Sequence, residues 1–185
     1  RRALESEKEA EVETHWTDAT GSTFRPVAEE GFCFRDVRVR ETSASPESLF
    51  EVVRSIGGER GYYCADWLWE LRGLMDRLVG GPGMRRGRPA VGELEVGEPL
   101  DFWRVENIEP GRSLLLRAEM KLPGIARLQF VVKPTKNGSR LVQTARFWPD
   151  GITGRLYWWS VMPMHEIVFG GMSRAITRQA EKVER

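Results

Sequence analysis

Apolar and polar residues alternate over several short stretches of the chain, which predicts β-strands. In the first, from Phe32 to Arg40, apolar and charged residues alternate as in a half-buried strand, with one shift of register after Phe34 that a β-bulge would produce. Five further strands are predicted in close order at residues 94–96, 100–108, 113–122, 126–133 and 140–148. Turn sequences such as Glu109-Pro110-Gly111 and Lys136-Asn137-Gly138 separate them with the spacing of an antiparallel meander.

Two short amphipathic helices are predicted between the first strand and the meander. The first follows Ser45, a suitable N-cap, has Pro46 at its first position and ends at Gly57-Gly58. The second begins at Asp66 and ends at Gly80-Gly81-Pro82.

A long apolar helix is predicted from Gly151 to the C-terminus, with a kink at Pro163. Apolar residues such as Trp158, Trp159 and Phe169 lie on more than one of its faces, so both sides of the helix need cover. The sheet would cover one side. A ligand, a partner domain, a second copy of the chain or a membrane interface would cover the other, and we expect a ligand together with a partner domain.

The order of elements from Phe32 to the end is similar to that of START-like (SRPBCC-type) domains. The resemblance implies an α+β helix-grip fold, in which a curved antiparallel sheet wraps around a long C-terminal helix and two short helices follow the first strand. It also implies a cavity for a small hydrophobic ligand.

Four runs of sequence further resemble an uncharacterised domain family that follows NmrA-like or short-chain-dehydrogenase Rossmann domains. The runs are Gly61-Tyr62-Tyr63 with Asp66-Trp67-Leu68-Trp69, Gly83-Met84-Arg85-Arg86-Gly87-Arg88, residues 101–106 and residues 118–124. The resemblance implies an NAD(P)-dependent Rossmann domain upstream as a partner, and it supplies no catalytic residues. We therefore expect two parts: residues 1–31, a charged helix and linker at the tail of such a domain, and residues 32–185, the helix-grip domain. A chain that opens on Arg1 fits a piece of a longer polypeptide.

Composition narrows the classes of function. The 185 residues suit one domain, and a formal net charge of +1 provides no field to attract nucleic acid. Two cysteines are too few for a disulfide framework, which favours a cytoplasmic location. The apolar stretch from Leu156 to Phe169 is too short for a transmembrane segment. No G-x-G-x-x-G follows a strand, so any NAD(P) would be bound by the upstream domain and not here.

Seven tryptophans suggest a cavity with aromatic walls, although a well-filled core would need the same residues. We predict a pocket of roughly 300–1,000 Å³ for a small apolar compound such as an isoprenoid, polyketide, quinone or acyl compound. The predicted ligand-binding residues are Trp67, Trp69, Trp103, Met120, Phe130, Trp159 and Arg146.

Catalytic chemistry has weaker candidates. Glu119, Lys121, Gln129 and Arg146 on neighbouring strands, with His165 on the last helix, would fix the polar end of a ligand or perform acid/base catalysis, with His165 and Glu119 as the catalytic candidates. The alternation instead favours a solvated outer face with cross-strand ion pairs, and His165 also fits a structural role.

The remaining candidates are basic or metal-binding groups. Arg85, Arg86 and Arg88 would grip the phosphate of a cofactor, or form an exposed basic loop. With only two histidines and no cysteine cluster, no metal site is predicted. The sequence leaves three functions open: a ligand-binding module, a substrate-specificity or acid/base domain of an oxidoreductase, and an interaction domain without a ligand.

Overall fold

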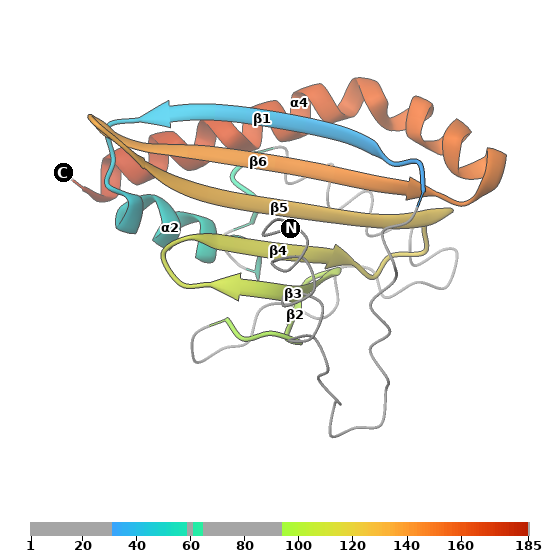
Figure 1. Ribbon diagram of the computed structural model, residues 1–185, viewed down its shortest axis with the longest axis horizontal. Helices are drawn as coiled ribbons and strands as arrows, with labels where there is room; N and C mark the ends of the chain where they lie inside the picture. Colours follow the sequence, from blue (N-terminus) through green and yellow to red (C-terminus); the bar gives the residue numbers. More distant parts are fainter. Residues whose placement is uncertain (1–30, 59–60, 65–93, 185) are drawn as a thin grey trace, which may run out of the picture. The chain divides into compact units, whose positions relative to one another are not determined.

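The computed structural model describes residues 31–58, 61–64 and 94–184, and those from Phe32 onward belong to one compact unit. The elements in chain order are β1 (Phe34–Thr42), α2 (Pro46–Arg54), β2 (Pro99–Leu100), β3 (Trp103–Glu109), β4 (Ser113–Ala118), β5 (Gly124–Thr135), β6 (Gly138–Pro149) and α4 (Gly151–Val183) (Figure 1). The predicted linker before Gly31 and the predicted second short helix lie outside the described residues.

The strands form one six-stranded antiparallel sheet in the order β1-β6-β5-β4-β3-β2. The predicted meander is confirmed from β3 to β6. Residues 94–96 do not form the predicted strand, and the short strand before β3 is Pro99–Leu100 instead. Lys136 and Asn137 form the two-residue connection between Thr135 and Gly138, which are paired across the β5–β6 hairpin.

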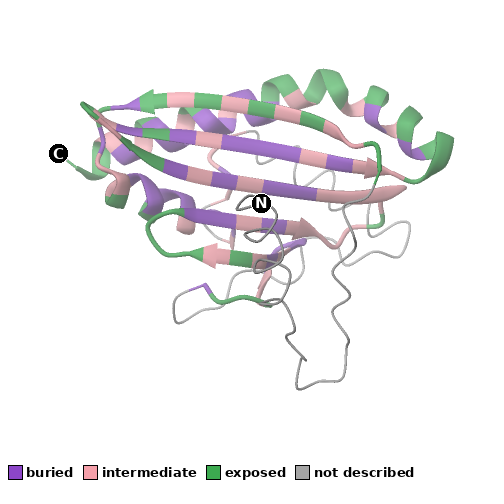
Figure 2. Ribbon diagram, in the orientation of Figure 1, coloured by how far each residue is buried: buried purple, intermediate pink, exposed green. Residues whose placement is uncertain are grey.

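Both helices pack on the same side of the sheet, where α4 contacts β1 and β6 and α2 contacts β5 and β6 (Figure 1). The N-cap of α2 is Ser45, whose hydroxyl accepts from the Ser48 backbone N–H, as predicted. The core lies between sheet and helices, and its fully buried side chains include Leu49, Ile56, Leu114, Leu116, Leu128, Phe130, Leu141, Met172 and Ile176 (Figure 2). This arrangement agrees with the predicted curved antiparallel sheet and long C-terminal helix.

Strand β1 departs from the expected pattern. Its pairing with β6 runs without interruption from Phe34 opposite Phe147 to Thr42 opposite Ser139, so the predicted bulge is wrong. Val37 and Val39 are 42% and 53% exposed, because the alternation that turns Phe34 and Thr42 inward turns both valines outward. A register irregularity occurs in β3 instead, between Val105 and Asn107.

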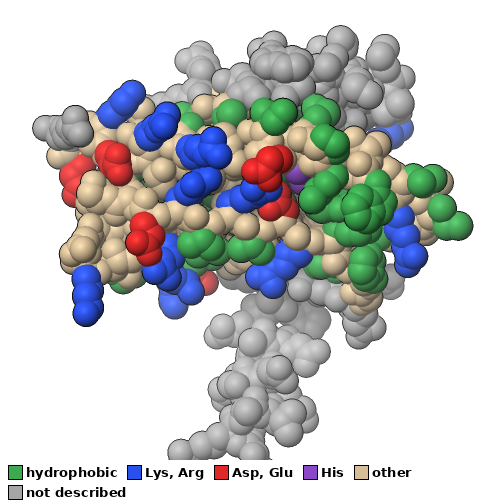
Figure 3. Space-filling view, turned by 90° about the horizontal axis from the view of Figure 1, so that it is seen from above, with side chains coloured by type: hydrophobic (Ala, Val, Ile, Leu, Met, Phe, Trp, Pro, Cys, Tyr) green, Lys and Arg blue, Asp and Glu red, His purple; other side chains and the backbone are tan. Residues whose placement is uncertain are grey.

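Helix α4 is continuous from Gly151 to Val183 and contains Pro163. Its C-terminal half is largely buried against the sheet and α2, whereas its N-terminal half exposes Ile152, Leu156, Trp159 and Ile167, each by more than 60%. Figure 3 shows the corresponding gathering of hydrophobic side chains towards the beginning of the helix. The second apolar side that the sequence predicts is therefore present, and no described residue covers it.

Candidate ligand cavity

An apolar cavity of about 130 Å³ lies between the sheet and the N-terminal half of α4. The sheet contributes Trp103, Ala118, Met120, Leu122, Ala126, Arg127, Ala145, Arg146 and Phe147, and the helix contributes Tyr157, Trp158, Val161, Met164, His165, Val168 and Phe169. Carbon atoms make up most of this lining, so the cavity suits an apolar occupant.

Three alanines on neighbouring strands line the sheet side of the cavity. Ala126, Ala145 and Ala118 occupy inward-facing positions on β5, on β6 and at the end of β4. On the same inward face, Leu128 is paired with Ala145 and Leu116 with Leu128, and both leucines are fully buried in the core. The cavity therefore adjoins the close-packed core directly.

The volume of the cavity in the structure differs from the predicted volume. About 130 Å³ is below the expected range of roughly 300–1,000 Å³, and it is close to the roughly 150 Å³ of an engineered cavity that binds benzene. A single aromatic ring matches this space better than a long isoprenoid or a polyketide.

His165 lies on the helical wall of the cavity between two aromatic rings. Its imidazole makes edge-to-face contacts with Trp158 and Phe169, with centroids 4.7 Å apart in both cases. Burial lowers the pKa of His165 to about 4, against the opposing effect of the Asp36 charge and together with the charge of Arg38. The ring is thus neutral at pH 7, and its buried Nδ1 atom has no hydrogen-bond partner among the described residues.

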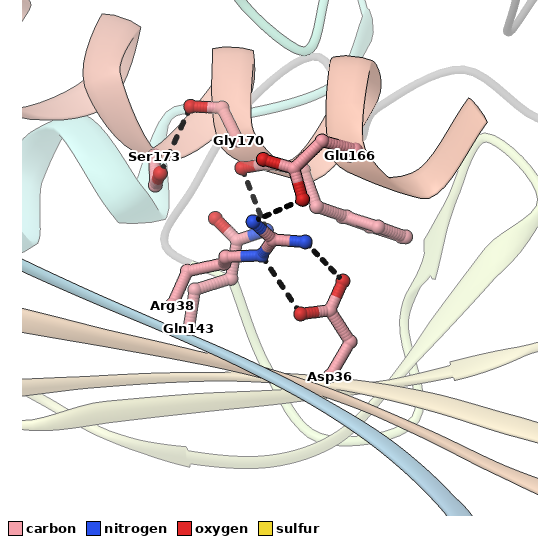
Figure 4. Close-up of polar contacts among 7 residues, drawn as sticks. Asp36, Arg38, Gln143, Glu166, Gly170 and Ser173 are labelled. Atoms are coloured by element: carbon pink, nitrogen blue, oxygen red, sulfur yellow. Dashed lines mark hydrogen bonds and ion pairs between the residues drawn. The ribbon is translucent and has the colours of Figure 1, made fainter. Parts of the chain in front are cut away.

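Charged residues lie beside this wall, between β1 and α4 (Figure 4). Arg38 donates from Nε to Asp36 Oδ1 at 2.7 Å and from Nη2 to Oδ2 at 3.0 Å, while its Nη1 lies 2.7 Å from Glu166 Oε2. The two carboxylates raise the pKa of Arg38. The Arg38 guanidinium is therefore engaged on both sides and is unsuited to binding an anionic ligand.

The structure brings only some of the predicted ligand-binding residues to the cavity. Trp103 and Met120 line it, and so does Arg146, whose Nη1 donates to Gln129 Oε1 at 3.1 Å. Phe130 is fully buried in the core and is not a lining residue, and Trp159 is 65% exposed on α4. Trp67, Trp69, Arg85, Arg86 and Arg88 lie outside the described residues.

The two acid/base candidates do not come together. The carboxylate of Glu119 accepts from Nε and Nη2 of Arg104, and Glu119 is not a lining residue, whereas His165 is. Glu119 and Gln129 thus each contact an arginine of a neighbouring strand, an arrangement that fits the outer-face interpretation of this polar set.

Sequence reasoning missed much of the lining, including Phe147, Trp158, Phe169 and the three alanines. The alanines carried a weak signal: they lie on neighbouring strands, but Ala126 is paired with Phe147 and Ala145 with Leu128, so they do not share one level of the sheet. The lining residues of α4 carried a weaker sequence signal. In a helix that is apolar on several faces, periodicity does not distinguish the buried Trp158 from the exposed Trp159.

The described ranges contain no cluster of three or more potential metal ligands. Within the same ranges, no helix has both the length and the apolarity needed to cross a bilayer.

Comparison with known proteins supports the fold. The sequence model of the family described as "Protein of unknown function (DUF2867)" matches residues 29–172. No curated protein matches the chain.

Two solved proteins illustrate the structural similarity. The Zhui aromatase/cyclase from Streptomyces sp. R1128 has 14% sequence identity and a TM-score of 0.52, with 83% of this chain and 97% of that chain covered. Norcoclaurine synthase from Thalictrum flavum, in complex with dopamine and hydroxybenzaldehyde, has 13% identity and a TM-score of 0.50, with 82% and 88% covered. At these identities the similarity shows the fold alone, and it confirms the predicted helix-grip class.

Proposed function

We propose that this chain, which belongs to the family described as "Protein of unknown function (DUF2867)", is a binding module that holds a small apolar molecule between its sheet and α4. The observation that carries the proposal is the cavity of about 130 Å³, with apolar groups on both the sheet side and the helix side. Pockets for small organic ligands in proteins have this character: mostly apolar walls with a few polar groups.

The energetics of an empty cavity support an occupant. The cavity is partly open, and its apolar walls lack the packing contacts that a filled core would give them. A ligand that fills the space would restore those contacts and stabilise the fold by mass action. Binding should therefore be visible as a rise in thermal stability.

The ligands bound to a structural neighbour have a size that is compatible with this cavity. The norcoclaurine synthase structure contains dopamine and hydroxybenzaldehyde, each of which has one aromatic ring. At 13% identity this is an analogy of fold, so it supports the size class of the ligand and not its identity.

Titration with toluene tests the proposal, because toluene has the size of one ring and no polar group. We expect toluene to bind the wild-type protein in calorimetry and to raise its unfolding temperature. Ala118→Leu and Val161→Phe add bulk inside the cavity, so each should reduce toluene binding at least ten-fold. Leu156→Ala, at an exposed position of the same helix, is the control and should bind toluene like the wild type. Absence of binding to the wild type, or equal binding to both cavity variants, would contradict the proposal.

We also propose, from the four resembling sequence runs, that the module operates beside an NAD(P)-dependent Rossmann domain in a reducing cytoplasm. A content of two cysteines, too few for a disulfide framework, supports the choice of compartment. The complete reading frame that encodes this chain provides the test. A Rossmann domain encoded upstream in the same frame is expected, and a frame without one would remove the redox part of the proposal.

A further inference from the structure

A row of arginines crosses the outer face of the sheet, the face on which neither described helix packs (Figure 1). The strand register places five of them directly opposite one another: Arg35 on β1, Arg146 on β6, Arg127 on β5, Arg117 on β4 and Arg104 on β3. From this row we propose that the outer face docks an acidic amphipathic α-helix of a partner protein. The surface is separate from the cavity, which lies on the helix side of the sheet.

Strand alternation fixes the side of the sheet on which the row lies. Arg146 stands between Ala145, which belongs to the core, and Phe147, whose ring stacks on Trp158 of α4, so its side chain points the other way. Arg146 borders the cavity from within its strand, but its guanidinium group donates to Gln129. Residues that are paired directly across strands share one face, so the other arginines of the row lie on the outer face too.

The described carboxylates neutralise the row unevenly. Arg104 and Arg127 each form an ion pair with a glutamate. At the β1 end, Arg35 is exposed and directly opposite the half-buried Arg146, and neither of these two pairs with a carboxylate in the described part of the chain. Like charges directly opposite each other destabilise a sheet, so carboxylates supplied by a partner would relieve repulsion there.

An apolar row runs beside the arginines on the same face. Val37 and Val39 follow Arg35 on β1 at alternate positions and are 42% and 53% exposed. Val142 is paired with Val39 and with Val131, and both of these partners on β6 and β5 are half-buried. The valine row lies about 13 Å from the arginine row, and an α-helix with its side chains is about 10–12 Å across. One helix laid across the strands therefore reaches both rows.

The spacing of the row fits a helix better than an extended strand. Neighbouring strands of a sheet are about 4.8 Å apart, so the arginines extend over about 19 Å. Acidic residues one turn apart on a helix repeat every 5.4 Å or so, close to the spacing of the arginines, whereas those on one side of a strand repeat about every 6.7 Å. Each guanidinium can bind a carboxylate through two parallel hydrogen bonds.

A nucleic-acid backbone fits this face less well. The carboxylates of Glu106 and Glu119 lie within the row, where they would repel phosphates. The valine row offers a phosphate backbone no favourable contact, and the formal net charge of the chain is only +1. An acidic amphipathic helix uses both rows, because its glutamates face the arginines while its apolar stripe covers the valines.

Fluorescence anisotropy with labelled synthetic peptides tests the proposal on the complete chain. The probe is a helix-forming peptide of about 18 residues, with glutamates one turn apart on one stripe and leucines on the adjacent stripe. It should bind the wild-type protein. A peptide with glutamines in place of the glutamates should bind about ten-fold more weakly, and a peptide of the same composition in scrambled order about five-fold more weakly.

Three results with the wild type would overturn the proposal. They are absence of binding of the probe, equal binding of the probe and the scrambled peptide, and tighter binding of a single-stranded oligothymidylate than of the probe. The last result would identify the face as a nucleic-acid surface.

Paired variants locate the binding face. Arg35→Gln/Arg146→Gln removes two charges from the β1 end of the row and should weaken binding of the probe about five-fold. Arg174→Gln/Arg178→Gln removes the same charge from exposed positions of α4, on the other side of the sheet, and should change the affinity less than about two-fold. Equal losses in the two variants would show a general effect of net charge and overturn the assignment to the outer face.

A cavity variant keeps this test separate from that of the proposed function. Ala118→Leu is expected to lose toluene binding and should bind the probe peptide like the wild type, because the two sites lie on opposite faces of the sheet. Circular dichroism checks that each variant folds. Should the Arg35→Gln/Arg146→Gln variant fail to fold, the comparison of the three peptides on the wild type still decides the question.

Discussion

Arg38 on β1 and Glu166 on α4 form an ion pair, with Nη1 2.7 Å from Oε2, that joins the edge strand of the sheet to the helix beside the cavity. The opposite side of the same guanidinium binds Asp36 through two hydrogen bonds. The inward face of β1 is thus charged at this level, which explains why Val37 and Val39 point outward. Besides the stacking of Phe34 on Trp158, one arginine therefore links β1 to α4 at this level.

Replacement of Arg38 by methionine should destabilise the protein by about 2–3 kcal/mol, because it leaves the Asp36 carboxylate buried without a counter-charge. Urea unfolding measures the effect. The double variant Asp36→Leu/Arg38→Met should recover most of the loss, since an apolar pair needs no counter-charge.

Glu166→Gln is the control for this prediction. The Glu166 side chain is 67% exposed, so its contribution to the ion pair should be below about 1 kcal/mol. A loss for Glu166→Gln equal to that for Arg38→Met would show that Asp36 is not the group that requires the arginine.

The buried imidazole of His165 should make stability depend on pH. Its pKa is about 4 in the folded protein and about 6.5 in the unfolded chain, so only the unfolded chain takes up the proton between these values. The stability that it contributes is present above pH 6.5 and should be lost as the pH falls to 4, by about 3 kcal/mol in total.

The variant His165→Phe isolates this contribution. The free energy of unfolding of the wild type minus that of the variant should decrease by about 3 kcal/mol from pH 7 to pH 4. Asp36, Arg38 and Glu166, the charged groups near the ring, are present in both proteins, so most of their own titration cancels. A difference that stays constant over this range would show that the ring is not buried in its neutral form.

Two glycines of α4 should respond in opposite directions to alanine. At Gly154 an added Cβ would overlap the backbone oxygen of Pro123 and lie 2.8 Å from Cα of Pro149. Gly154→Ala should therefore push the start of α4 away from the sheet and cost about 2–3 kcal/mol.

At Gly170 the nearest atom to an added Cβ is Glu166 Oε1 at 3.5 Å, an ordinary contact. Gly170→Ala should be neutral or stabilising by up to about 1 kcal/mol, because alanine is the better helix former. Chemical denaturation of Gly154→Ala and Gly170→Ala measures the change in the free energy of unfolding for each variant. Equal destabilisation of the two would mean that close packing at Gly154 does not fix the start of the helix.

The sequence predicted the parts of the fold that depend on local signals. Ser45 capped the predicted helix, and Lys136-Asn137-Gly138 formed the predicted hairpin turn, because caps and tight turns are set by neighbouring residues. The pattern of apolar and polar residues did not predict the charged inward face of β1. The partner of Arg38 on α4, Glu166, is 128 positions away in the sequence, so no local pattern reveals this ion pair.

The same reason limited prediction of the cavity. The aromatic content and the strand alternation indicate Trp103 and Met120, and both line the cavity. The volume and the role of the alanines depend on the level at which β4, β5, β6 and α4 meet, which strand register determines. His165 was singled out, but its buried and unpartnered Nδ1 atom is a property of the packed structure.

A crystal structure of the protein grown with bromobenzene tests the central claim most directly, since bromine is located by its anomalous scattering. One bromine peak is expected inside the cavity, among Ala118, Trp158 and Phe169. A cavity without a bromine peak at saturating bromobenzene, or a ligand bound only elsewhere on the protein, would contradict the claim that the cavity holds a small apolar molecule.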